Sequence, residues 1–211
     1  MIALLLAAAE PQTAIEAERA LAADTQRIGQ WTAFRKWAAT DAVMFVPQGS
    51  EPPVVNAQKW LKERSNPSAS VFREPAHVWQ SCDGSLAVAT GTWRRIDNSM
   101  GSFITVWKRQ PDGAWRWVLE DGNVLAAKDR RSVSDPKVDC RRKPPKLPRA
   151  VVHGYEEPGG TGQSADTTLR YGWTLHPNTA DYPPSWSYDI SVDLWNGRGW
   201  SHVFSEYLVD Q

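Results

Sequence analysis

Three runs of strand-forming residues stand in the middle of the chain. Residues 85–95, 101–109 and 115–119 are rich in small, β-branched and aromatic side chains, a composition typical of strands. Residues 110–113 read Gln-Pro-Asp-Gly, and this order predicts a hairpin turn because Pro presets its own φ and Gly accepts positive φ. The central stretch is therefore predicted to be an antiparallel meander.

Helical patterns precede this meander. Residues 13–28 are Ala-rich with a sparse apolar stripe, and Gly29 is placed to end a helix there. Residues 31–38 carry apolar side chains on one helical face, and Asn56 can cap a third helix over residues 57–64. Residues 41–47 and 71–80 read as strands, the second with a proline that marks an edge or a bulge. This order predicts an α+β fold, with three helices packed on one face of a strongly curved, mostly antiparallel sheet.

The last third of the chain has a different character. Residues 129–150 are rich in proline, lysine and arginine and are interpreted as a stiff, solvated linker. Residues 151–211 form a second, all-β unit, because residues 169–175 and 187–194 alternate cleanly between apolar and polar and a returning strand follows from residue 199. A glycine-rich run at residues 159–162 is interpreted as a flexible loop. A three-stranded meander is too thin to hide its own apolar residues, so we expect it to dock on the first unit.

Composition narrows the function classes. The 211 residues carry 24 basic and 24 acidic side chains, so no overall charge favours nucleic acid or an anionic membrane. Twelve tryptophans are many for this length, and we interpret them as core residues that also suit an apolar pocket. Two cysteines and four scattered histidines show no metal-ligand spacing, so neither a metal nor a cofactor is predicted.

The N-terminus and the cysteines bear on location. Residues 1–9 read MIALLLAAA and resemble the apolar part of a signal peptide without its basic start, so residues 1–12 are taken as a possible signal segment. We expect a periplasmic or secreted protein, with a cytoplasmic one as the alternative. In an oxidising compartment a disulfide between Cys82 and Cys140 is the natural use of the pair. No run of apolar residues approaches the length of a membrane span.

Several short motifs, taken in order, resemble those of one superfamily. They are Gly29-x-Trp31-x-x-Phe34, then Asp41-Ala-Val-x-Phe-x-Pro47, Asp83-Gly84-x-x-Ala87, Gly91-x-Trp93, Thr105-x-Trp107 and Asp112-Gly113-x-Trp115. The set resembles the NTF2-like superfamily, in its SnoaL-like and DUF4440-like branches, over residues 13–126. The resemblance implies a cystatin-like cone with an apolar pocket over residues 13–128, and frequent dimerisation through the outer face of the sheet, so the protein is expected to be a monomer or a homodimer.

The same superfamily includes ketosteroid isomerase, and the comparison argues against that activity. The carboxylate base of that enzyme would fall at Val46, and its two oxyanion-hole donors near Ala22 and Thr105. Proton abstraction beside a carbonyl needs a base and an oxyanion donor within reach, and valine and alanine supply neither. Steroid isomerisation is therefore not predicted.

The remaining candidates are polar residues on the strands of the cone. If Trp115, Trp117 and Leu119 point inward, Asp121 is the pocket carboxylate; if the alternate residues point inward, it is Glu120. The set of three apolar residues favours the first arrangement and thus Asp121, whereas the ketosteroid isomerase comparison favours Glu120. Both stay candidates, with His77 as a partner for acid–base work. A further set of residues is predicted to face the pocket and contact a ligand: Val46, Trp93, Thr105 and Trp107.

Three functions are compatible with the sequence. The first is a pocket protein of the cell envelope that binds a small apolar or aromatic molecule. The second is a lyase, isomerase or hydrolase-like enzyme that uses a pocket carboxylate with His77. The third is a structural or interaction module with a filled cone, and the presence and chemistry of a cavity separate the three.

Overall fold

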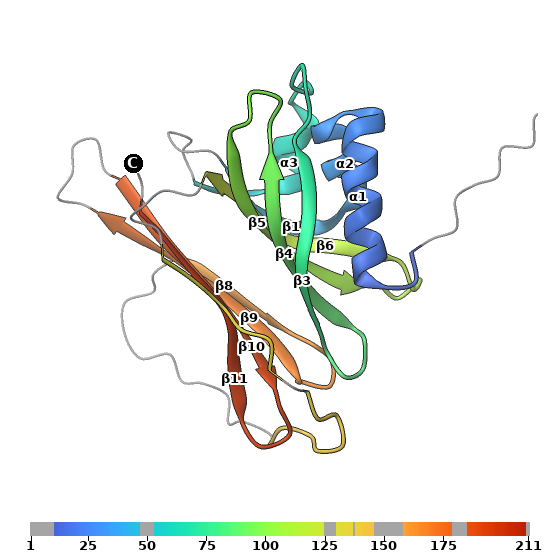
Figure 1. The fold of residues 1–211 in the computed structure, drawn as a ribbon, viewed down its shortest axis with the longest axis vertical. Coiled ribbons are helices and arrows are strands. Elements are labelled where there is room, and N and C mark those ends of the chain that lie inside the picture. The colour runs from blue at the N-terminus through green and yellow to red at the C-terminus, as the bar shows by residue number, and fades with distance from the viewer. Residues whose placement is uncertain are drawn as a thin grey trace, which may run out of the picture.

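The protein consists of three layers in a computed structural model that describes residues 11–46, 53–124, 130–136, 138–145, 158–178 and 185–209. Figure 1 shows the helices on one face of a first sheet and a second sheet on its other face. The predicted α+β class is confirmed. The segment at residues 1–10 and the loop that begins at Pro47 lie outside the described residues.

The helices lie close to the predicted positions, except that the third helix ends two residues earlier than predicted, at Lys62. They are α1 (Ala14–Ile28), α2 (Gln30–Trp37) and α3 (Ala57–Lys62). Thr13 and Glu16 form a reciprocal capping box at the start of α1, which satisfies two backbone donors that the helix cannot. Gly29 has a φ of 90° and separates α1 from α2, and the Asn56 side chain accepts a hydrogen bond from the Lys59 N–H to cap α3.

The first sheet has six strands in the order β2-β1-β6-β5-β4-β3. Their bounds are β1 (Ala38–Phe45), β2 (Val54–Asn56), β3 (Phe72–Gln80), β4 (Leu86–Arg94), β5 (Met100–Arg109) and β6 (Trp115–Val124). All neighbours are antiparallel except β1 and β6. The register slips between Pro75 and His77 on the edge strand β3, so the predicted proline signal marks both an edge and a bulge.

The second sheet is larger than the sequence predicts. It has five antiparallel strands in the order β7-β11-β10-β9-β8. Their bounds are β7 (Arg130–Val133), β8 (Gly159–Gln163), β9 (Leu169–Asn178), β10 (Ser185–Trp195) and β11 (Trp200–Val209). The glycine-rich run is thus a strand and not a flexible loop, and part of the predicted linker is β7. Both errors have one cause: pairing with β9 or β11 supplies the hydrogen bonds that these short segments cannot make alone.

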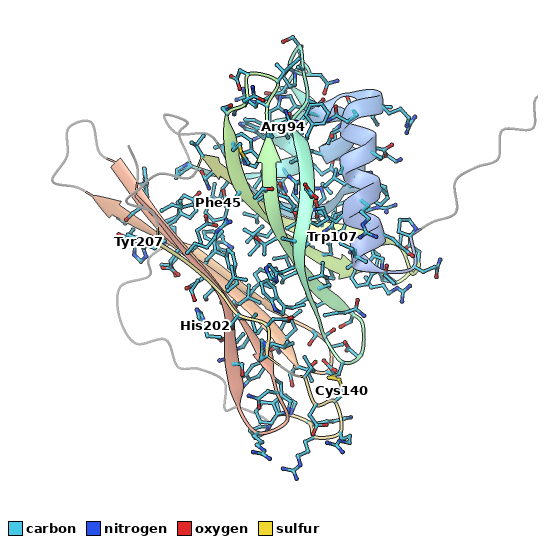
Figure 2. The ribbon with its side chains drawn as sticks, in the orientation of Figure 1. Phe45, Arg94, Trp107, Cys140, His202 and Tyr207 are labelled. Carbon is cyan, nitrogen blue, oxygen red and sulfur yellow. A yellow bond between two sulfur atoms is a disulfide. The ribbon has the colours of Figure 1, made fainter. Side chains whose placement is uncertain are left out.

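Two apolar cores lie on the two faces of the first sheet. One packs the helices against its inner face and contains Trp37, Trp107 and Trp117, while the other lies between the two sheets. Figure 2 shows Phe45 between the sheets and Trp107 on the side of the helices. The second core contains residues of both sheets, and so it confirms the predicted docking of the C-terminal unit on the first unit.

A covalent link adds to this packing. Cys82, in the turn after β3, and Cys140 form a disulfide, seen beside the Cys140 label in Figure 2. The bond holds the segment after β7 against the first sheet. No helix among the described residues is long and apolar enough to cross a membrane.

Candidate functional site

A cavity of about 200 Å³ opens between the helices and the inner face of the first sheet, and we call this opening the mouth of the cone. Its wall is mostly aromatic and aliphatic, with a few polar groups. The lining residues are Gln30, Trp31, Phe34, Met44, Phe45, Pro67, Ala69, Val71, Arg73, Trp93, Arg95, Glu120 and Gly122. Elsewhere the tryptophans of the inner core pack between the helices and the sheet, so this interior is neither empty nor wholly filled.

The base of this cavity is a buried charged cluster centred on Arg73. The Arg73 side chain is 2% exposed, and its guanidinium donates to Glu18 at 3.0 Å, to Thr105 at 2.9 Å and to the Glu120 carboxylate. Glu120 also accepts a hydrogen bond from the Thr105 hydroxyl at 2.7 Å. The Trp107 indole N–H donates to Glu18 at 2.9 Å. Every member of the cluster is therefore tied to at least one other, as buried polar groups require.

Aromatic rings hold the guanidinium in place. The Arg73 Cζ atom lies 3.8 Å from the centre of the Phe103 ring and 5.2 Å from that of Phe34. A planar guanidinium suits such stacking, since it is weakly hydrated and its edges stay free for carboxylates. The cluster thus combines a cation, two carboxylates and an apolar shell.

Glu120 is poised to titrate near neutrality. Burial raises the pKa of Glu120 to about 7; Arg73 opposes this shift, and the neighbouring Glu18 adds to it. One guanidinium faces two carboxyl groups, so the site prefers to hold a proton. A carboxyl with such a pKa can both accept and donate hydrogen bonds at physiological pH.

A β-bulge selects Glu120 over Asp121 as the pocket carboxylate. Trp107 pairs with Trp117, whereas the preceding Val106 pairs with Leu119, so Val118 is an extra residue in β6. The extra residue reverses the alternation: the tryptophans before it face the helices, and Glu120 after it also faces them. Each predicted alternation was therefore right for one half of the strand, and neither could include the bulge.

Asp121 lies on the opposite face of the first sheet, between the two sheets. Its carboxylate accepts hydrogen bonds from Asn123 Nδ2 at 2.8 Å and from the Tyr188 hydroxyl at 3.0 Å. Burial, with the nearby Glu206 as the second cause, raises the pKa of Asp121 well above its usual range. Asp121 is a buried interface carboxyl and does not line the cavity at the mouth of the cone.

His77 is not brought to the cavity. The imidazole is exposed and stacks with Trp79, with ring centres 5.9 Å apart, and Trp79 belongs to the core between the sheets. His77 and Glu120 consequently lie on opposite faces of the first sheet. The acid–base pair considered from the sequence is not assembled in this arrangement.

The four residues predicted to contact a ligand lie in different parts of the structure. Trp93 lines the cavity, and Thr105 lies directly behind it, bonded to Glu120. Trp107 lies deeper, bonded to Glu18, and Val46 packs against the inner core without lining the cavity. Neither Val46 nor the half-buried Ala22 supplies a functional group, in keeping with the argument against steroid isomerisation.

Sequence reasoning missed two members of the charged cluster: Arg73, which lines the cavity, and Glu18, which does not line it but is paired with Arg73. A signal for Glu18 was present, because it shares a helical face with Ala14, Ala17 and Leu21, all fully buried. A charged residue inside the apolar stripe of a helix needs a buried partner. Nothing local identifies Arg73 as that partner, since the two are 55 residues apart.

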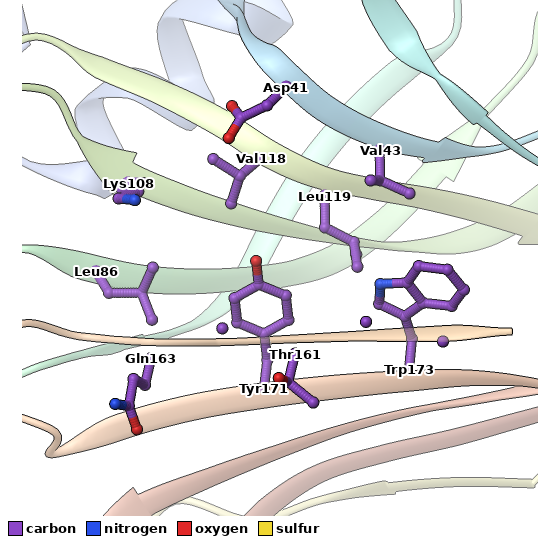
Figure 3. Close-up of a pocket in the computed structure, with 13 residues that line it drawn as sticks. Asp41, Val43, Leu86, Lys108, Val118, Leu119, Thr161, Gln163, Tyr171 and Trp173 are labelled. Atoms are coloured by element: carbon purple, nitrogen blue, oxygen red, sulfur yellow. The ribbon is translucent and has the colours of Figure 1, made fainter. Parts of the chain in front are cut away.

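A second and larger space, of about 390 Å³, lies between the two sheets (Figure 3). Figure 3 shows Tyr171 and Trp173 projecting toward Leu119 on the opposite sheet, with Asp41 at the far side. Its charged residues, Asp41 and Lys108, are exposed and make no buried cluster. We therefore take the smaller cavity, with its desolvated charges, as the candidate site.

No cluster of three or more His, Cys, Asp or Glu side chains in the described part of the chain is arranged to hold a metal ion. The cavity offers one carboxyl near its titration point, the two guanidinium groups of buried Arg73 and exposed Arg95, and a ring of aromatic side chains.

Several solved structures resemble about half of this chain. A candidate ketosteroid isomerase from Parabacteroides distasonis has 18% identity and a TM-score of 0.41, over 54% of this chain and 86% of its own. An NTF2-like protein from Cytophaga hutchinsonii has 13% identity and a TM-score of 0.41, over 53% and 94%. An NTF2-like protein of unknown function from Shewanella oneidensis has 12% identity and a TM-score of 0.39, over 51% and 93%.

These structures are similar to this chain in fold. They include NTF2-like proteins, the superfamily that the sequence motifs resemble. No family model matches the sequence, and no curated protein sequence matches it.

Proposed function

We propose that this protein binds a small, mostly apolar molecule, about one aromatic ring in size, that carries a single hydrogen-bond donor. The observation that supports this most is the Glu120 carboxyl, backed by Arg73, at the base of a cavity with aromatic walls. Binding sites for small molecules commonly combine an apolar wall with a few convergent polar groups.

The size of the cavity limits the ligand. An engineered apolar cavity of about 150 Å³ in another protein holds benzene. The space of about 200 Å³ at the mouth of the cone therefore suits one substituted ring, and a fused steroid skeleton is too large.

The charges at the base limit the polar end of the ligand. Arg73 is already shared between two carboxylates, so the base has no surplus positive charge to attract an anion. A phenolic hydroxyl or a protonated amine can instead donate to Glu120. Carboxylate ligands should be rejected from the base, because they would add a negative charge, with little dielectric screening, beside Arg73, which already faces two acidic groups. The other cation of the wall, Arg95, is exposed and stacks on Trp93 away from this base.

The test uses 4-fluorophenol as the probe, observed by fluorine NMR, with 4-fluorobenzoate as the anionic comparison. Gly122 lines the cavity, and a Cβ added there meets its nearest atom, Trp93 Nε1, at an ordinary 3.7 Å. Gly122→Leu should therefore fill the cavity without disturbing the sheet and abolish binding. Gly199→Ala is the matched control, since a Cβ there meets nothing within 4 Å.

We expect 4-fluorophenol to bind the wild type and the control equally, and 4-fluorobenzoate to bind at least about tenfold more weakly, the equivalent of about one charged hydrogen bond. Glu120→Gln should weaken phenol binding by a similar factor. Equal binding to wild type and Gly122→Leu would show that this cavity is not the site.

A second candidate function is general-base catalysis by Glu120, which its pKa of about 7 favours. The probe is acetophenone in D₂O, whose methyl protons exchange when a base removes them. Exchange that exceeds the buffer rate and disappears in Glu120→Gln would support an enzyme. Exchange at the buffer rate leaves the binding function.

Export to the cell envelope completes the proposal. The disulfide between Cys82 and Cys140 supports it, because disulfides persist in oxidising compartments and are rare in the cytosol. Fractionation of the native host should recover the protein outside the cytoplasm, and recovery in the cytoplasm with reduced cysteines would contradict this part.

A further inference from the structure

Two turns of the chain share both sequence and geometry. Residues 80–86 read Gln-Ser-Cys-Asp-Gly-Ser-Leu and residues 163–169 read Gln-Ser-Ala-Asp-Thr-Thr-Leu, so four of seven positions are identical. Gly84 and Thr167, at the same place in each, both have positive φ, 68° and 61°. Matching hydrogen bonds hold both turns: Ser81 to Asp83 and Ser164 to Asp166 at 2.7 Å, and the N–H of Leu86 to Ser81 and of Leu169 to Ser164 at 3.1 Å.

The likeness extends across four strands. Starting from these turns, β3-β4-β5-β6 and β8-β9-β10-β11 have the same order, direction and register. One row across the first sheet runs Trp79, Val88, Val106, Leu119, and the corresponding row of the second sheet runs Gly162, Tyr171, Val192, Phe204.

The irregularities of the two sheets coincide as well. The bulge that inserts Val118 into β6 has a counterpart in β11, where Val192 pairs with Phe204 and Asp193 with His202, so Val203 is extra. A buried acid stands three residues after each extra valine: Asp121 follows Val118 in the first sheet, and Glu206 follows Val203 in the second. Bulges are local departures from regular pairing, and their coincidence is not required by sheet geometry alone.

Contacts between the two units are reciprocal. The Asp83 N–H donates to Asp166 Oδ2 at 2.9 Å, and the Asp166 N–H donates to Asp83 Oδ2 at 2.8 Å. A second matched pair joins the same turns: the Cys82 N–H to Thr168 Oγ1 and the Ala165 N–H to Ser85 Oγ, each at 2.9 Å. Contacts in which i meets j and j meets i define an interface between equivalent surfaces related by a twofold axis.

The two copies use their faces differently. Both turn the same apolar face toward the core between the sheets. The other face of the first copy lines the cone with Trp93, Phe103 and Trp107. The corresponding positions of the second copy are polar: they are, in the same order, His176, Asp189 and Asp193. In the described residues from 130 to 209 no helix covers that face.

We propose that β8–β11 is a second copy of β3–β6 that occupies, within one chain, the place of a partner subunit. The outer face of the first sheet is then an internal interface between two copies of one sheet. The second copy has exchanged its pocket-lining residues for polar ones, because no helices cover them and the face meets water. The functional unit is one chain with one cone cavity.

The repeat also explains the space between the sheets. Gly160 and Gly162 on β8 are equivalent to His77 and Trp79 on β3. In the first copy the Trp79 side chain packs on Phe204 and occupies the region that the glycines leave open in the second copy. The space of Figure 3 lies beside these glycines. A Cβ added at Gly162 would come within 2.4 Å of the Tyr171 ring, whereas Trp79 faces the smaller Val88.

This exchange gives a direct test in the full-length protein. Gly162→Trp alone should lower the melting temperature by about 5 °C, because the new side chain collides with Tyr171. The double variant Gly162→Trp with Tyr171→Val recreates the pairing of Trp79 with Val88 and should lose less than Gly162→Trp alone. Gly162→Trp with Tyr207→Val is the matched control: Tyr207 is exposed and does not face residue 162, so the whole loss should remain.

Two outcomes overturn the proposal. The first is a double variant as unstable as Gly162→Trp, or less stable, which would mean that the two sheets are not equivalent at this pair. The second is a homodimer in sedimentation or light scattering, where we expect the mass of one chain, 23.6 kDa, before removal of any signal segment.

Discussion

Replacing Glu120 by glutamine tests the electrostatics of the buried cluster. Glu120 has an ordinary pKa of 4.5 when exposed and a pKa of about 7 in the folded protein. A folded-state pKa above the unfolded one means that the stabilising contribution is complete below pH 4.5 and is lost as the pH rises through 7. The difference corresponds to about 3 kcal/mol of unfolding free energy between the two ends of this window.

Glutamine keeps the shape and the acceptor oxygen but does not titrate. Between pH 5 and pH 8 the wild type should therefore lose about 2–3 kcal/mol more stability than Glu120→Gln, and the variant should be the more stable protein at pH 8. Arg73 keeps Glu18 as its partner in the variant, so no unpaired cation is created.

The assay is urea unfolding followed by circular dichroism at pH 5, 6, 7 and 8, with the difference between the two proteins taken at each pH. Asp97→Asn serves as the control, because Asp97 is exposed and hydrogen bonds from Ser99 lower its pKa, so it does not titrate in this range. Parallel pH curves for wild type and Glu120→Gln would falsify the assignment of the neutral-pH titration to Glu120.

Three further predictions follow from other parts of the molecule. Thiol titration of the unfolded, unreduced protein should find no free thiol, and reduction of the Cys82–Cys140 bond, whose cysteines are 58 residues apart, should cost about 4 kcal/mol; two titratable thiols in exported protein would contradict the pairing. A Δ5-ketosteroid should not be isomerised above the buffer rate, since Val46 and Ala22 offer no base or donor; turnover that disappears in Glu120→Gln would show this reasoning to be wrong. Deleting residues 151–211 should expose the outer face of the first sheet and cause dimerisation or aggregation, so a truncated protein that stays monomeric with an unchanged melting temperature would refute the importance of the docking.

Local chemistry accounts for much of what the sequence determined. The Thr13 capping box, the positive φ of Gly29 and the Asn56 cap all act within a few residues, and so the starts of α1 and α3 and the break between α1 and α2 could be located from the sequence. The hairpin at residues 110–113 was equally local. Three of the five strands of the second sheet could also be identified, two from the alternation in residues 169–175 and 187–194 and the third as the returning strand from residue 199.

The repeat between residues 80–86 and 163–169 was also present in the sequence but was not recognised. Its second copy begins in a glycine-rich segment that has no strand pattern of its own. A search for short internal matches could have found it, because the identical positions are the ones whose side chains hold the turn.

Tertiary structure alone decided the candidate site. The bulge at Val118 places Glu120, and not Asp121, in the cavity, and a bulge forms only when two strands have paired. Arg73 and Glu18 lie 55 residues apart and meet because a curved sheet brings β3 over α1. Short-range patterns record which face of a helix or strand is apolar, whereas the partner across that face depends on how the elements pack, and in this protein the partners of the buried charges create the site.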